Sequence, residues 1–320
     1  MAFLLPSTAS GQTADFNIIP RPQQVNVSND APFTLNAKTV ISLGTNSQDM
    51  KRNANMLASY IEQATGIRPA IGKSKSGATI IPTIDKTIAN AEGYKLDADA
   101  KQIRISGASA AGVFYGIQTL RKSLPLVNGK ASKVSIPAVH ITDAPRFAYR
   151  GTHLDVSRHF VTADSVRQFI DMLALHNINR FHWHLTDDQG WRIEIKKYPL
   201  LTQIGSKRAQ TVIGHNSGKY DGKPYSGFYT QKQIRDIVKY AADRYITIVP
   251  EIDLPGHMQA ALAAYPDMGC TGGPYEVWQK WGVSDNVLCA GNDKTLTFID
   301  NVLKEITQLF PSKYIHVGGD

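Results

Sequence analysis

The second half of the sequence alternates between strand-like and helix-like segments, and this alternation restricts the fold more than any other feature. Four segments have the composition of β-strands: residues 147–156, 181–186, 245–250 and 314–317. Three segments between them carry an apolar stripe at helical spacing: residues 164–176, 230–244 and 294–310. Such alternation predicts a parallel sheet with right-handed crossovers. Because a complete eight-stranded barrel typically needs about 250 residues, we predict that residues 146–320 form a (β/α)8 TIM barrel of which only about the first four βα units are present.

Residues 16–145 predict a separate, small α/β domain. Strands are expected at residues 39–43, 79–83, 93–96 and 102–106, and helices at residues 50–64 and 109–124. One mixed sheet covered by two helices is enough for an independent domain. Residues 1–15 begin with a short apolar patch followed by small residues, so we expect a signal remnant or a disordered segment there. This favours a periplasmic or secreted location.

Charge and hydropathy argue against two classes of function. The net charge is +8, but the Lys and Arg residues are scattered along the chain instead of clustered, and clustering is what indicates nucleic-acid binding. No apolar run approaches the roughly 18 residues that a membrane span requires. We therefore expect no nucleic-acid partner and no membrane span. The oligomeric state is left open.

Polar residues follow each of the four predicted strands in the second half of the chain. These residues are Asp155, Arg158 and His159 after the first strand, Asp187 and Asp188 after the second, Glu251, Asp253 and His257 after the third, and Asp320 after the fourth. The carboxyl ends of barrel strands lie on one rim, where the catalytic residues of such folds are found. The sequence therefore predicts a single site on this rim.

The strand at residues 181–186 leaves one assignment open. Aromatic and aliphatic residues alternate there with His182 and His184, as in a β-strand. If this period continues, Asp188 lies on the side of the two histidines and Asp187 on the side of Trp183. The pattern does not say which side faces the barrel interior.

A second interpretation of the same segment is a metal-dependent TIM-barrel hydrolase. Two histidines near paired aspartates resemble a site in which imidazoles bind zinc. However, His182 and His184 precede the end of the strand, and no further ligand pattern stands out. We therefore expect no metal and no other cofactor, and keep the metallohydrolase as an alternative.

Four segments together resemble the glycoside hydrolase family 20 β-N-acetylhexosaminidases. They are residues 150–160 (RGTHLDVSRHF), 182–191 (HWHLTDDQGW), 250–257 (PEIDLPGH) and 316–320 (HVGGD). The resemblance implies a small α/β domain followed by a (β/α)8 barrel. It also implies hydrolysis of terminal, non-reducing N-acetyl-β-D-hexosamine residues from glycans, by a retaining, substrate-assisted mechanism with an oxazolinium intermediate. It leaves open whether the sugar is gluco or galacto.

The resemblance also implies roles for individual residues. Asp320 matches the aspartate that orients the acetamido group, and Asp187 and His257 match a hydrogen-bonded pair that tunes the general acid. Arg158 matches the arginine that holds two sugar hydroxyls. We expect Asp188, Trp191 and Glu251, which lie in the same segments, to contact substrate as well.

In the family, the general acid follows the residue that Asp320 matches, and the chain ends before it. We therefore expect the parent enzyme to be active and this fragment to be inactive. An inactive sugar-binding relative remains an alternative.

Two expectations come from position in the sequence. Arg150 precedes the carboxyl end of its strand by too many residues to reach the rim, so we expect it to be structural. Cys270 and Cys289 are the only cysteines and bracket an insertion after the third strand. We predict that they form a disulfide, provided that the compartment is oxidising.

Overall fold

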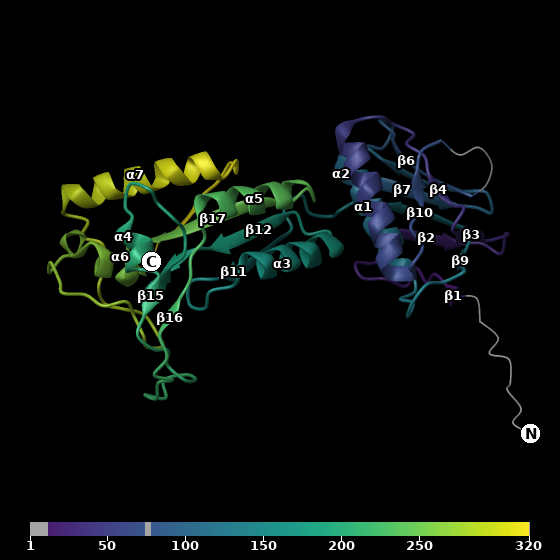
Figure 1. The fold of residues 1–320 in the computed structure, drawn as a ribbon. Coiled ribbons are helices and arrows are strands. Elements are labelled where there is room, and N and C mark those ends of the chain that lie inside the picture. The colour runs from purple at the N-terminus through teal and green to yellow at the C-terminus, as the bar shows by residue number, and fades with distance from the viewer. Residues whose placement is uncertain (1–11, 74–77, 320) are drawn as a thin grey trace, which may run out of the picture. The chain divides into compact units, whose positions relative to one another are not determined.

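The computed structural model describes residues 12–73 and 78–319 (Figure 1). The chain divides into two units, Met1–Ala148 with Leu175–Asn177 and Tyr149–Ala174 with Ile178–Asp320. Of the segment 1–15, residues 1–11 lie outside the described residues. The prediction of disorder is wrong for Gln12–Thr13, which form strand β1 and pair in parallel with β9 (Lys133–Ile136).

The first unit is a mixed sheet with two helices on one face. The sheet has seven strands in the order β2-β10-β7-β8-β6-β4-β5, and β1, β9 and β3 form a second sheet. The remaining strands are β2 (Gln24–Val27), β3 (Phe33–Asn36), β4 (Val40–Ile41), β5 (Ala70–Ile71), β6 (Thr79–Ile84), β7 (Tyr94–Ala98), β8 (Gln102–Gly107) and β10 (Val139–Asp143). Helices α1 (Gln48–Thr65) and α2 (Ala110–Ser123) pack against each other and against this sheet, as predicted (Figure 1).

Both helices begin at a serine cap. The side chain of Ser47 accepts the Met50 N–H at the start of α1, and that of Ser109 accepts the Gly112 N–H at the start of α2. These contacts satisfy backbone donors that have no partner inside the helix. Helix α1 ends at Gly66, whose φ of 72° is left-handed and strains any residue with a Cβ atom.

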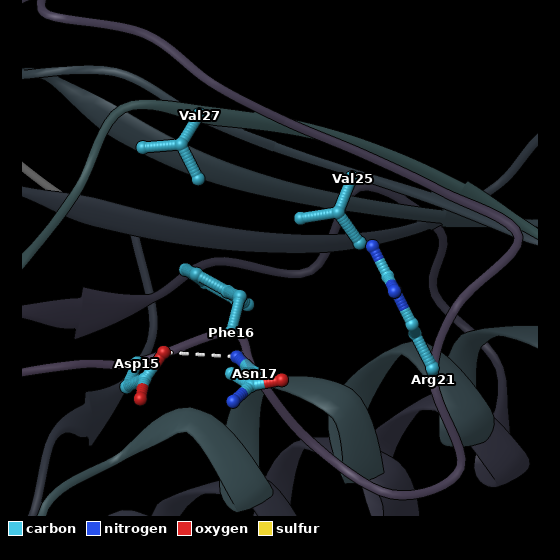
Figure 2. A pocket seen from close by; sticks show the side chains of 6 residues that line it. All are labelled: Asp15, Phe16, Asn17, Arg21, Val25 and Val27. Carbon is cyan, nitrogen blue, oxygen red and sulfur yellow. Dashed lines mark hydrogen bonds between the residues drawn. The ribbon is translucent and has the colours of Figure 1, made fainter.

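A shallow hollow of the first unit is lined by side chains that Figure 2 shows. They are Asp15, Phe16, Asn17, Arg21, Val25 and Val27. The carboxylate of Asp15 accepts the Asn17 N–H at 2.9 Å, so it orders its own loop (Figure 2). The hollow has one guanidinium, one carboxylate and one amide beside apolar side chains, and it contains none of the predicted site residues, which lie in the second unit.

The second unit contains the predicted parallel sheet of four strands in the order β11-β12-β17-β18. The strands are β11 (Gly151–Asp155), β12 (Arg180–His184), β17 (Thr247–Leu254) and β18 (His316–Gly318). The crossover helices are α3 (Ala163–Leu175), α5 (Gln231–Ala242) and α7 (Asp293–Leu309). A capping box between Thr230 and Gln233 starts α5. Strand β11 begins four residues later than predicted, at Gly151.

Shorter elements follow strands β12 and β17. They are β13 (Thr186–Asp187), β14 (Gly190–Trp191), α4 (Leu200–Gln203), β15 (Lys207–Arg208), β16 (Tyr225–Ser226), α6 (Gln259–Ala264) and the 3-10 helix η1 (Pro266–Met268). Strands β13 and β14 form a small antiparallel hairpin, as do β15 and β16. Among the described residues, no helix has both the length and the apolarity that crossing a bilayer would require.

The two faces of strand β12 have opposite chemistry, which decides the question that the sequence left open. Phe181 and Trp183 are fully buried; Phe181 contacts Phe169 of α3, and Trp183 contacts Tyr229 before α5. This is the helix-covered face. His182 and His184 therefore point to the opposite face of the sheet, which in an α/β barrel is the interior.

Candidate active site

Four polar residues form a row across the parallel sheet. In the strand register, Asp155 of β11 lies beside His184 of β12, His184 lies beside Glu251 of β17, and Glu251 lies beside His316 of β18. In-register neighbours in a sheet point to the same face. The row therefore lies on the face opposite the helices, and it includes the last residues of β11 and β12.

Glu251 is the centre of a cluster of histidines. Its Oε2 atom lies 2.7 Å from His182 Nε2 and 2.5 Å from His184 Nδ1, and its Oε1 atom lies 2.9 Å from His316 Nδ1. Burial raises the pKa of this carboxyl, but the hydrogen bonds from His182 and His184 outweigh burial and hold its pKa well below the usual range. Glu251 is predicted from the sequence to bind substrate, yet here both of its oxygens are engaged by the protein.

His184 joins Glu251 to Asp187. Its Nδ1 atom faces Glu251, and its Nε2 atom lies 2.8 Å from Asp187 Oδ2. Burial lowers the pKa of the imidazole, but the hydrogen bonds to the two carboxylates and the charges of Glu251 and Asp155 raise it to about 10. The ring is therefore protonated at neutral pH.

Asp187 faces the site because strand β12 ends at His184. Beyond that point the chain turns into the β13–β14 hairpin, in which Asp187 pairs with Gly190, so the alternation of sides cannot be extended to it. Asp187 Oδ2 lies 2.7 Å from Arg158 Nη1, and Oδ1 lies 3.1 Å from His257 Nδ1. The predicted hydrogen bond between Asp187 and His257 is therefore present.

His257 is held in an uncommon backbone conformation beside two carboxylates. Its φ is 55°, in the left-handed region that non-glycine residues seldom adopt and that clusters at functional sites. Burial lowers the pKa of its ring, but the charges of Asp187 and Asp188 together raise it above the ordinary value. His257 is therefore a candidate for a proton-carrying group near neutral pH.

The structure gives Asp188 a different role from the predicted contact with substrate. Its side chain is 0% exposed, and its oxygens accept the Gln259 N–H at 3.1 Å and the Ser284 N–H at 2.9 Å. Burial raises the pKa of this carboxyl, although the two hydrogen bonds oppose the change. Asp188 Oδ2 also lies 3.5 Å from His257 Nδ1, so Asp188 lies beside His257 while it fixes the loops that follow β17.

Trp191 also lies in the core and not on a sugar-binding surface. It is 1% exposed, its Nε1 donates to the Ile193 carbonyl at 2.7 Å, and its ring contacts Phe298 of α7. Trp191 belongs to β14, which returns from the rim toward the helix layer. The prediction that it binds substrate is therefore not supported by its position.

Arg158 lies at the rim in the loop after β11. Its side chain is 37% exposed, and its Nη1 lies 3.1 Å from Asp155 Oδ2 in addition to the contact with Asp187. Arg150 precedes β11 and so lies at the opposite end of the strand, as predicted. Arg158 is therefore the arginine of the two that can reach a ligand at the carboxyl ends of the strands.

Two buried arginines that the sequence analysis did not single out hold this loop in place. Arg192 donates to the Ser157 carbonyl at 2.7 Å, and Arg208 donates to the Arg158 carbonyl at 2.9 Å. Burial lowers the pKa of Arg192 to about 10. A Cβ atom at Gly190 would lie 2.2 Å from the Arg192 guanidinium, so the glycine leaves room for that group. Neither arginine follows a predicted strand, so no sequence pattern pointed to them.

The remaining predictions concern Asp320 and the two cysteines. Asp320 lies outside the described residues. The disulfide between Cys270 and Cys289 is not formed, since both are free cysteines in the structure. A hydrogen bond with the Cys289 thiol raises the pKa of Cys270, so the two thiols do lie beside each other.

Three groups of side chains in the described part of the chain lie close enough together to hold a metal ion. They are His153, His182 and Glu251; His184, Asp187 and Asp253; and Asp187, Asp188 and His257. An imidazole must be neutral to bind a metal, but His184 faces a carboxylate oxygen with each nitrogen. Glu251 Oε2 also already accepts from two histidines. These donor sets fit hydrogen bonds between charged groups better than they fit metal ligation.

Comparisons with known proteins place both units in one family. Residues 147–320 match the model "Glycosyl hydrolase family 20, catalytic domain", and residues 15–144 match "Glycosyl hydrolase family 20, domain 2". A β-hexosaminidase from Porphyromonas gingivalis is 44% identical over 311 residues, which are 95% of this chain and 38% of the relative. A β-hexosaminidase from Vibrio furnissii is 37% identical over 99% of this chain and 50% of its own length.

Solved structures agree with these matches. An N-acetyl-β-hexosaminidase from Streptomyces plicatus in complex with Thio-NAglucal has a TM-score of 0.83 and 36% identity, over 94% of this chain and 58% of that one. An exo-β-N-acetylglucosaminidase from Vibrio harveyi in complex with N-acetylglucosamine has a TM-score of 0.82 and 32% identity, over 97% and 48% of the two chains. The chain thus spans roughly half the length of the relatives it matches.

Proposed function

Because the chain belongs to glycosyl hydrolase family 20, we propose that the protein hydrolyses terminal, non-reducing N-acetyl-β-D-hexosamine residues of glycans. We further propose the retaining, substrate-assisted mechanism that the resemblance of its sequence segments to this family implies. The substrates would be glycans or oligosaccharides ending in an N-acetylhexosamine.

The observation that carries this proposal is the meeting of Arg158, Asp187 and His257 at the carboxyl ends of neighbouring strands. A planar guanidinium offers several N–H donors in fixed directions, which suits two neighbouring hydroxyls of a sugar. Arg158 is partly exposed and uses its Nη1 on Asp155 and Asp187. Its remaining donors can therefore serve a ligand on the rim.

In the proposed reaction the sugar supplies the nucleophile. The acetamido carbonyl oxygen forms a bond to the anomeric carbon while the bond to the leaving oxygen breaks, and a general acid gives that oxygen its proton. Water then attacks the anomeric carbon of the oxazolinium, transfers a proton to the same group and restores the acetamido group with net retention. We assign Asp320 the role of orienting the acetamido N–H, and Asp187 with His257 the role of tuning proton transfer. Among the 320 residues we assign no general acid.

The test is an assay of the full-length protein on aryl N-acetyl-β-glucosaminide and the matching galactosaminide. We expect release of the aryl group, and NMR should detect the β-anomer of the sugar first. A thiazoline analogue of the oxazolinium should inhibit competitively. Release of the α-anomer first, or no inhibition by the analogue, would contradict the mechanism. Activity that disappears with a chelator and returns with zinc would favour the metallohydrolase instead.

A further inference from the structure

His184 is a buried link between two carboxylates that come from different strands. Its Nδ1 lies 2.5 Å from Glu251 Oε2, and its Nε2 lies 2.8 Å from Asp187 Oδ2. The three side chains are at most 6% exposed, so water does little to weaken the contacts between them. Glu251, His184 and Asp187 thus form a continuous chain of hydrogen bonds that ends at His257.

The geometry favours a proton on each ring nitrogen of His184, because each nitrogen faces a carboxylate oxygen. A neutral imidazole carries one N–H and would turn its other lone pair toward a carboxylate oxygen. The imidazolium form donates to both carboxylates. Arg158 Nη1 lies 3.2 Å from His184 Nε2 and 2.7 Å from Asp187 Oδ2, so in the imidazolium form these two nitrogens are donors that share this oxygen.

We propose that His184 is a positioning residue that remains protonated throughout the reaction and, together with Glu251, sets the charge that Asp187 presents to His257. This inference rests on the proposed function, since it concerns the same site. His184 donates to Oδ2 of Asp187, which leaves Oδ1 directed at His257 Nδ1 and at the Asp188 N–H. The positive charge of His184 also offsets part of the negative charge that His257 experiences from Asp187.

Glu251 is the group that keeps the proton on His184. The other titratable groups facing the ring are Asp155 and His153 of β11, and Arg158 of the loop that follows. Burial and the neighbouring His182 and His184 lower the pKa of His153. Lowering the pKa favours the neutral form of the His153 ring, so His184 is the histidine of this pair that carries the charge. On the far side of Glu251, His182 and His316 contact the carboxylate without reaching Asp187.

Three carboxylates near His257 determine how readily its ring keeps a proton. Asp187, Asp188 and Asp253 all raise the pKa of this ring. If His184 loses its charge, the field of Asp187 on His257 is less compensated. His257 should then hold its proton to a higher pH, by about one pH unit for a charge at this range.

The proposal is tested by NMR titration of the histidines in the full-length protein. In the wild type, both ring nitrogens of His184 should keep imidazolium chemical shifts up to about pH 9, while His257 titrates lower. In His184→Gln the titration of His257 should move to higher pH, and in Glu251→Gln it should move by a smaller amount, because that change also removes the negative charge of Glu251. The double variant should match Glu251→Gln, because neither retains a charge at residue 184 or residue 251.

The matched control is His182→Gln. This variant also removes a hydrogen bond to Glu251 but does not touch Asp187, so it should leave the His257 titration in place. The proposal fails if His184 of the wild type titrates below pH 8, or if folded His184→Gln leaves His257 unchanged. It also fails if His182→Gln moves His257 equally. These readouts need no turnover, so their outcome is independent of whether the proposed hydrolysis is detected.

If the hydrolysis is detected, a second readout applies. The limb of the pH profile of kcat/KM that follows His257 should move to higher pH in both His184→Gln and Glu251→Gln. A loss of rate at every pH, with the limb unmoved, would indicate a structural role for His184 and would overturn the proposal.

Discussion

Arg158 Nη1 lies 2.7 Å from Asp187 Oδ2, and this contact joins the loop after β11 to the hairpin after β12. The first strand and the second thus deliver their functional groups to one place. The consequence is that the position of the guanidinium depends on both loops and on the backbone contacts of the buried Arg192 and Arg208.

Replacing Arg158 by Lys should reduce kcat/KM of the full-length protein on aryl N-acetyl-β-glucosaminide. A single ammonium cannot hold the two aspartates and a pair of sugar hydroxyls at once, so we expect a loss of about 2–3 kcal/mol in transition-state binding. Arg150→Lys is the control, and it should leave kcat/KM within about threefold. A crippled Arg150→Lys beside an unaffected Arg158→Lys would show that the roles are reversed.

Replacing Trp191 by Ala should lower the free energy of unfolding. The side chain is buried against Phe298, and truncating a buried Trp costs about 3–5 kcal/mol. The measurement is the midpoint of denaturant unfolding. Trp281→Ala is the matched control, because Trp281 is 55% exposed and its loss should cost less than about 1 kcal/mol. If Trp191→Ala is as stable as the wild type but binds N-acetylglucosamine poorly, then the sequence-based role is right after all.

The stability of the second unit should fall between about pH 6.5 and pH 10. The folded-state pKa of His184 is about 10, whereas an unfolded His has a pKa near 6.5. The stabilisation is therefore complete below about pH 6.5 and is lost as the pH rises through 10. One proton contributes a slope of about 1.4 kcal/mol per pH unit in this window. Denaturant unfolding at several pH values should show this slope in the wild type and a flatter curve in His184→Gln. Equal slopes would mean that His184 is not charged in the folded state.

Cys270 and Cys289 should form a disulfide when the protein is exposed to an oxidant, as it would be in the periplasm or outside the cell. The two cysteines lie near each other, since a hydrogen bond with Cys289 raises the pKa of Cys270, and closing the loop between them stabilises by roughly 3 kcal/mol in the chain-entropy model. A count of free thiols before and after oxidation checks the bond, with Cys289→Ser as control. Two thiols that remain titratable after oxidation would rule the disulfide out.

The sequence predicted the regular elements well because their signals are local. The parallel order of β11, β12 and β17 follows from alternation, and α2 and α5 lie within the predicted ranges 109–124 and 230–244. The candidate site is predicted less completely because it depends on where a strand stops. The strand at residues 181–186 ends at His184, two residues early, and the turn that follows directs Asp187 to Arg158 and His184, whereas Asp188 accepts backbone N–H groups of Gln259 and Ser284.

Trp191 and the two buried arginines illustrate a second limit. The place of Trp191 in a segment that resembles the family predicts a contact with substrate, but its neighbour Phe298 is more than a hundred residues away in the sequence. Likewise, Arg192 and Arg208 find their acceptors on backbone carbonyls, which carry no sequence signature. Contacts of this kind are fixed by tertiary packing alone.

The histidine cluster around Glu251 also protects the alignment of the strands. A slip of β17 by one residue would turn Glu251 toward the face of Phe181 and Trp183, into an apolar layer with no donors, and would leave His182, His184 and His316 without their shared acceptor. An ionised carboxylate buried without partners costs several kcal/mol. A mispaired sheet would therefore be rejected during folding, and the polar row that prepares the site for chemistry also selects the one register in which that site can exist.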